Sequence, residues 1–116
     1  MKFVMNGCLI IGTMDGANVE IAEEIGQHNM FIFGKNVGQV AEARRLMHEG
    51  DRSYVGSRLG RVYETIKCGT FGGNTQAFIH LIDSLIHGGD NYLVSHDFYS
   101  YLEAQEKVDA TYRDQR

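Results

Sequence analysis

Apolar and polar positions divide the chain into a first part with strands and a helical remainder. The run Leu9–Thr13 is apolar, rich in β-branched side chains and followed by turn residues, which predicts a strand buried on both faces. Residues 17–25 place their apolar side chains on one helical face and stop at Gly26, which predicts an amphipathic helix. Phe31–Phe33 is predicted to be a second buried strand, so the three elements form a βαβ unit with parallel strands.

The rest of the chain has the 3.6-residue period of helices. The predicted helices are 37–47, 59–68 and 78–86. We expect Asp15 or Asn18 to cap the helix after the first strand, because short polar side chains accept from the free N–H groups of a first turn. We also expect Tyr92–Val94 to be extended and Asp97 to cap a last helix. The predicted total is two strands and about five helices.

Two short parallel strands do not make a stable sheet by themselves. Such strands usually lie inside a larger sheet that is covered on both faces. Both apolar runs are predicted to be fully buried, and the partners that would bury them are not found in this sequence. The expected fold class is therefore α/β, with the chain forming part of a larger domain.

Composition narrows the class of protein. The 116 residues allow at most one domain, and 11 Lys+Arg against 15 Asp+Glu give a net charge of −4. No basic stripe is present, which argues against nucleic acid or an anionic membrane as a partner. No apolar run approaches the ~18 residues of a membrane span, and no signal peptide is evident. Cys8 and Cys68 lie far apart, which predicts reduced thiols in a cytoplasmic protein.

Residues that carry chemistry give weak signals when they are considered one by one. The glycines at positions 7, 12 and 16 do not have the spacing of a phosphate-binding loop, so turn glycines are the simpler interpretation. His80 and Asp83 lie three residues apart on one predicted helix, as two metal ligands could, but no further ligand converges on them. The acidic residues of the first amphipathic helix are expected to form a solvated face. Lys2 alone is typical of a solvated terminal residue.

The order of several short motifs resembles the pyridoxal-phosphate segment of the α-glucan (glycogen/starch) phosphorylases. The motifs are Met1-Lys2-Phe3, Asn6-Gly7, Ile11-Gly12-Thr13, Asp15-Gly16-Ala17-Asn18-Val19-Glu20, Phe31-Ile32-Phe33-Gly34 and Ile66-Lys67-Cys68-Gly69-Thr70-Phe71. The resemblance is strong again from Asp90 to Arg116 and weak over residues 35–65. It therefore covers the chain from end to end, with a variable middle.

The resemblance implies a fold and a place in a larger protein. Members of this family are two-domain glycosyltransferases of the GT-B type. Residues 1–116 would be the latter part of the Rossmann-like, cofactor-binding C-terminal domain, and the N-terminal domain would be absent. The family commonly forms homodimers, so the full-length protein is expected to be a cytoplasmic homodimer.

By resemblance, Lys2 is the residue that holds pyridoxal 5′-phosphate as a Schiff base. A lysine amine condenses with an aldehyde only when it has lost its proton, which burial or neighbouring cations favour. A solvated Lys2 does not meet that demand, so surrounding protein is expected to build the site. Lys2 would be an anchor and not the acid or base, and no catalytic residue or metal ligand is assigned to this chain.

The resemblance also implies a reaction. Orthophosphate would cleave a terminal α-1,4-linked glucose from an α-1,4-glucan and release α-D-glucose 1-phosphate, with retention of configuration. The 5′-phosphate of the cofactor would take part in proton transfer with the substrate phosphate. Nothing in the sequence chooses between glycogen, starch and maltodextrin.

Two other hypotheses remain beside this one. In the family, a loop containing Gly, Ser and Thr contacts the cofactor phosphate and precedes the segment that starts here at Met1. Because this loop and the sheet partners are not in the sequence, the first hypothesis expects a phosphorylase fragment that is inactive and poorly stable alone. The chain could instead be a catalytically dead interaction module that docks on a full-length phosphorylase through an open sheet edge. An unrelated nucleotide-binding βαβ fragment would require the long motif match to be accidental.

Overall fold

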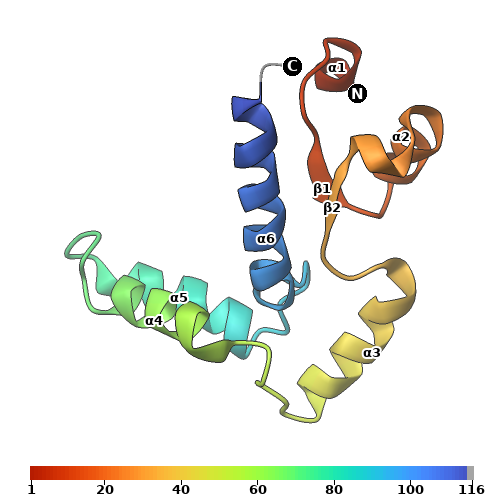
Figure 1. Ribbon diagram of the computed structural model, residues 1–116. Helices are drawn as coiled ribbons and strands as arrows, with labels where there is room; N and C mark the ends of the chain where they lie inside the picture. Colours follow the sequence, from red (N-terminus) through yellow and green to blue (C-terminus); the bar gives the residue numbers. More distant parts are fainter. Residues whose placement is uncertain (115–116) are drawn as a thin grey trace. The chain divides into compact units, whose positions relative to one another are not determined.

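The computed structural model describes residues 1–114, which contain six α-helices, one 3₁₀ turn and two strands. In chain order these are α1 (Lys2–Met5), β1 (Ile11–Thr13), α2 (Ala17–Ile25), η1 (Gln27–Asn29), β2 (Phe31–Phe33), α3 (Val37–His48), α4 (Gly56–Lys67), α5 (Thr75–Ile86) and α6 (Val94–Arg113) (Figure 1). The chain forms two compact units. Unit 1 comprises residues 1–40 and the chain from Asp97 on, and unit 2 comprises residues 41–96.

Unit 1 contains the predicted βαβ arrangement. Strands β1 and β2 are parallel, with Ile11 opposite Phe31 and Thr13 opposite Phe33. Helix α2 follows β1 and ends at Gly26, whose φ of 86° a glycine adopts without strain (Figure 1). The two strands and the helix between them are therefore confirmed, in a chain that is mostly helical.

The two strands are not covered on both faces within residues 1–114, which agrees with the expectation that the partners that would bury them are not found in this sequence. All three residues of β1 are only partly buried. Ile32, at the centre of β2, is 37% exposed, and Leu9 ahead of β1 is 40% exposed. The reason is that the sheet has two strands within residues 1–114, so too few neighbours are present to cover it.

The turn between β1 and α2 differs from the predicted capping. Gly16 is the N-cap residue, and no side chain caps the helix. The Asn18 side-chain amide instead donates to the Thr13 carbonyl at 2.9 Å, and the Thr13 hydroxyl donates to the Asp15 carboxylate at 2.9 Å. A Cβ at Gly12 would lie 2.7 Å from the Asn18 side-chain nitrogen, so this turn requires glycine there. The predicted capping residues thus close the turn and do not cap the helix.

The first half of α6 is tied to the end of β2. The Phe33 and Tyr101 rings meet edge to face with centroids 5.2 Å apart. The Gly34 amide donates to the Ser100 hydroxyl at 2.9 Å, and the Lys35 amide donates to the Asp97 carboxylate at 3.0 Å. The prediction that Asp97 caps the last helix is wrong, because α6 begins at Val94 and Asp97 accepts from a different segment.

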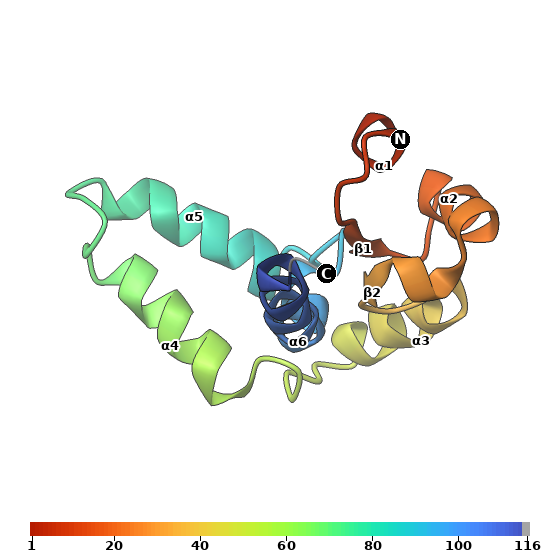
Figure 2. The same ribbon diagram turned by 45° about the horizontal axis from the view of Figure 1, so that its top comes forward.

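Unit 2 is built on two helices that lie side by side, α4 and α5 (Figures 1 and 2). The buried side chains of these helices are Leu59 and Tyr63 of α4, which are 4% and 5% exposed, and Ile82 of α5, which is 1% exposed. Ala43 and Met47 in the second half of α3 are buried as well. These residues follow the apolar period of the sequence, so the three predicted helices of this part are confirmed.

A buried carboxylate organises the start of α6. Asp90 is 2% exposed and accepts from the amides of Val94 and Ser95 at 2.9 and 2.8 Å, which satisfies two N–H groups of the first turn. Asp90 and Leu93 have φ values of 38° and 54°, so the chain turns here and is not extended. The expectation that Tyr92–Val94 is extended is therefore wrong.

A second buried contact joins this turn to α4. The hydroxyl oxygens of Tyr63 and Ser95 lie 2.5 Å apart, and burial raises the pKa of Tyr63. Tyr54 stacks on His96 with ring centroids 3.8 Å apart, and burial raises the pKa of Tyr54 as well. Both phenols therefore stay protonated at neutral pH.

Candidate functional site

Lys2 is the first residue of α1, a helix of four residues. The helix ends at Asn6, whose side-chain amide donates to the Lys2 carbonyl at 2.7 Å, and at Gly7, whose φ is 73°. The Lys2 side chain is exposed, and the neighbouring Phe3 and Met5 are 74% and 81% exposed. The local sequence therefore folds into a short exposed turn that presents the Lys2 amine to solvent.

A hollow of about 480 Å³ lies between α1 and α2 in unit 1. Its apolar lining comes from Met1, Val4, Met5, Ile21 and Ile25, and its polar lining from Glu20, Glu23 and Glu24. Three carboxylates make the hollow unfavourable for a phosphate group. Glu20, Glu23 and Glu24 are all exposed, so the expected solvated acidic face is confirmed, and this face also forms one wall of the hollow beside α1.

The surroundings of Lys2 in this chain do not fit pyridoxal phosphate. The amine is exposed, so burial does not favour its uncharged form. No Lys or Arg lines the adjacent hollow, so no cation is present there to hold the 5′-phosphate. Of the groups that such a cofactor needs, Lys2 and the lining of this hollow supply only the amine to which it would be attached.

The glycines that suggested a phosphate loop have local roles. Gly7 and Gly16 have φ values of 73° and 49°, in the left-handed region that favours glycine. Gly12 gives room for Asn18, as described above. The turn after β1 therefore uses Thr13, Asp15, Gly16 and Asn18 for its own hydrogen bonds and backbone conformation. No phosphate-binding role is assigned to this motif.

The pair His80 and Asp83 does not become a metal site. The Asp83 carboxylate lies 3.6 Å from the ring of His87, one turn further along α5. Across residues 1–114, no group of three or more His, Cys, Asp or Glu side chains is arranged to hold a metal ion. In that same part of the chain, no helix combines the length and the apolar character needed to cross a membrane.

Cys8 and Cys68 are both free, in agreement with the predicted reduced thiols. Both are exposed, so the simple expectation that Cys8 packs in the core beside the first strand is wrong. The Thr70 hydroxyl lies 3.1 Å from the Cys68 sulfur, and hydrogen bonding by Thr70 lowers the pKa of the Cys68 thiol. Neither cysteine lies in the hollow beside α1.

Comparison with known proteins gives a match over the whole chain. The family of carbohydrate phosphorylases matches residues 1–116. The chain is 48% identical over 121 residues to the alpha-1,4 glucan phosphorylase L isozyme of Ipomoea batatas, and 49% identical over 117 residues to the glycogen phosphorylase of Saccharomyces cerevisiae. It is 45% identical over 114 residues to glycogen phosphorylase 2 of Dictyostelium discoideum.

These matches cover nearly all of this chain and a small part of each relative. They include 100% of the chain for the first two relatives and 98% for the third. They span 12%, 13% and 11% of the respective relatives. The sequence identity is close to one half over the entire chain, and the family match covers the same residues, so both units of the described structure are included. The chain belongs to the carbohydrate phosphorylase family.

Proposed function

We propose that this chain is the latter part of the C-terminal, cofactor-binding domain of an α-glucan phosphorylase. The enzyme would release α-D-glucose 1-phosphate from glycogen or starch by phosphorolysis with retention of configuration. The observation that carries this proposal is the family match over residues 1–116. The parallel βαβ arrangement of unit 1 is compatible with the Rossmann-like domain of a GT-B glycosyltransferase.

In this proposal, Lys2 is the covalent attachment point of pyridoxal phosphate. Lys2 would hold the cofactor through its amine, and the bound cofactor would supply a phosphate group close to the substrate phosphate. Because the hollow beside α1 is acidic and Lys2 is exposed, the cations that would hold this phosphate are expected to come from residues other than those that line this hollow. This chain contributes the amine and the short turn that presents it.

The partners of the whole enzyme are an α-1,4-glucan and orthophosphate, and a second copy in a homodimer. The expected cytoplasmic location stays a prediction. One relative is named chloroplastic/amyloplastic and another, from Arabidopsis thaliana, cytosolic, so the names of relatives include both compartments.

A chimera tests the proposed function. The matching segment of the Saccharomyces cerevisiae glycogen phosphorylase is replaced by this 116-residue chain, and glucose 1-phosphate release from glycogen and orthophosphate is measured. We expect an active chimera, because 49% identity over the segment preserves most packing positions. A chimera with the secondary structure and hydrodynamic size of the parent, but no activity, contradicts the proposal. The isolated chain, assayed in parallel, is expected to release none.

A second experiment tests the incomplete cofactor site. The isolated chain is incubated with pyridoxal phosphate, reduced with borohydride and digested, and the labelled lysines are identified by mass spectrometry. We expect Lys2 to be labelled to the same extent as Lys35 and Lys107, because all three amines are exposed. Selective labelling of Lys2 would mean that this chain alone builds the cofactor site.

A further inference from the structure

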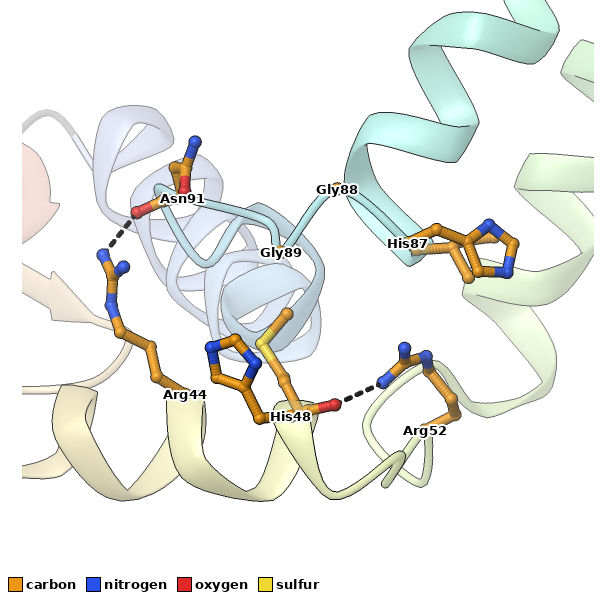
Figure 3. A pocket seen from close by; sticks show the side chains of 9 residues that line it. Arg44, His48, Arg52, His87, Gly88, Gly89 and Asn91 are labelled. Carbon is orange, nitrogen blue, oxygen red and sulfur yellow. Dashed lines mark hydrogen bonds between the residues drawn. The ribbon is translucent and has the colours of Figure 1, made fainter.

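Unit 2 contains a basic pocket that the proposed function does not use. It lies between the end of α3 and the turn that follows α5 and has a volume of about 200 Å³. Arg44, His48, Arg52 and His87 line it together with the backbone of Gly88 and Gly89, and no Asp or Glu lines it (Figure 3). The positive charge is concentrated at the pocket, because Lys and Arg equal Asp and Glu in number over unit 2 as a whole.

The two arginines of the pocket are not neutralised, whereas the arginine between them in the sequence is. Arg45 makes ion pairs with Glu42 and Glu49 on the outer side of α3. Within residues 1–114, no carboxylate forms an ion pair with Arg44 or Arg52. The two guanidinium groups therefore make no ion pair in this part of the chain; the pKa of the neighbouring Asp51 is lowered mainly by hydrogen bonds from Ser53, and the charge of Arg52 contributes to a smaller extent.

Both guanidinium groups are held in place by backbone carbonyls. Arg44 donates to the Asn91 carbonyl at 2.8 Å, and Arg52 donates to the Met47 carbonyl at 3.1 Å (Figure 3). Each of these bonds involves one terminal nitrogen. A guanidinium has five N–H donors, so each group keeps donors for a ligand while its position is fixed.

Neighbouring groups add to the donor set. In Figure 3, His48 lies between the two arginines, and an imidazole N–H donates whether or not the ring is charged. The Gly89 amide has no acceptor among the residues that the structure describes. His87 contributes less, because the Asp83 carboxylate lies 3.6 Å from its ring.

The size and chemistry of the pocket select a class of ligand. Its volume is below the ~300–1,000 Å³ of sites for larger organic ligands, which favours a small group. Guanidinium groups match the oxygen geometry of phosphate and can bind it through two parallel hydrogen bonds. We propose that this pocket binds a phosphate group, either as free orthophosphate or as the terminal group of a phosphate monoester. The proposal is independent of the cofactor at Lys2 and of activity.

Titration of the 116-residue chain tests this proposal. Inorganic phosphate and methyl phosphate are added separately at constant ionic strength, and the amide signals of Gly88, Gly89 and Asn91 are followed by NMR. For a small oxyanion we expect saturable binding with a dissociation constant of the order of 1 mM. Saturation by both ligands or by methyl phosphate alone indicates a monoester site, and saturation by orthophosphate alone indicates free phosphate. The absence of saturation with either overturns the proposal.

Variants separate this pocket from general charge attraction. Arg44→Gln and Arg52→Gln are each expected to weaken binding about five- to tenfold, because each removes charge-assisted hydrogen bonds. Arg58→Gln, an exposed change on α4 outside the pocket, should leave binding unchanged. Equal weakening by all three would overturn the proposal. Arg44 is exposed and makes one hydrogen bond, so Arg44→Gln decides the question if Arg52→Gln unfolds unit 2.

Discussion

Replacing Lys2 by alanine in the yeast chimera is expected to lower glucose 1-phosphate release by ~1,000-fold or more, because the cofactor and not the protein carries the hard chemistry. The change should not disturb folding of this segment. Lys2 is exposed, its side chain makes no hydrogen bond or ion pair within residues 1–114, and the bond from Asn6 uses the backbone carbonyl, which alanine retains. The loss should therefore appear in cofactor content as well as in activity.

The matched control is Lys35→Ala, which removes another exposed lysine of unit 1. Its amide bond to Asp97 belongs to the backbone and is unaffected. We expect this variant to keep the parent's activity and its cofactor absorbance. A Lys2→Ala chimera that retains both would show that another residue holds the cofactor, and the assignment of Lys2 would be wrong.

Replacing Asp90 by alanine is expected to lower the free energy of unfolding of unit 2 by about 2–4 kcal/mol. The carboxylate is 2% exposed and accepts from two amides at the start of α6, so its removal leaves two donors without acceptors. Alanine also tolerates a φ of 38° less well than aspartate does. Urea unfolding, with hydrogen exchange of the Val94 and Ser95 amides, measures the effect.

Two variants make this result specific. Asp90→Asn keeps one acceptor oxygen and tolerates the left-handed conformation, so it should lose about half as much stability. Asp109→Ala removes an exposed carboxylate of α6 that accepts only from Gln105, and it should change stability by less than about 0.5 kcal/mol. Equal losses for Asp90→Ala and Asp109→Ala would contradict the role given to Asp90.

The helices of this chain could be predicted from the sequence where one face is apolar over several turns. Helices α2, α4 and α5 lie where the 3.6-residue spacing of apolar side chains predicts them, because burial of the apolar face decides which residues become helical. The start of α6 could not be predicted in this way. Its cap is Asp90, four residues before Val94, and it acts through a turn with two residues of positive φ. Aspartate and leucine seldom adopt that conformation, so their side chains gave no indication of it.

The two candidate sites differ in how far the sequence predicts them. Lys2 was identified by resemblance alone, because the groups that would activate it are absent from its surroundings. The basic pocket gave no sequence signal. Arg44 and Arg52 are separated from His87 by more than thirty positions and meet it only after α4 and α5 have folded back. Isolated charged residues on helices are usually solvated, so the sequence did not distinguish these from the others.

The bonds between β2 and α6 have a consequence for synthesis on the ribosome. The amides of Gly34 and Lys35 meet their acceptors 66 and 62 positions later in the chain. At about 5–20 residues per second, this partner helix emerges ~3–13 s after the strand it completes. Every contact within unit 2 is available sooner, since its residues lie between those two segments. Unit 2 can therefore form first during synthesis, while the parallel strands stay half-covered until the first half of α6 has emerged.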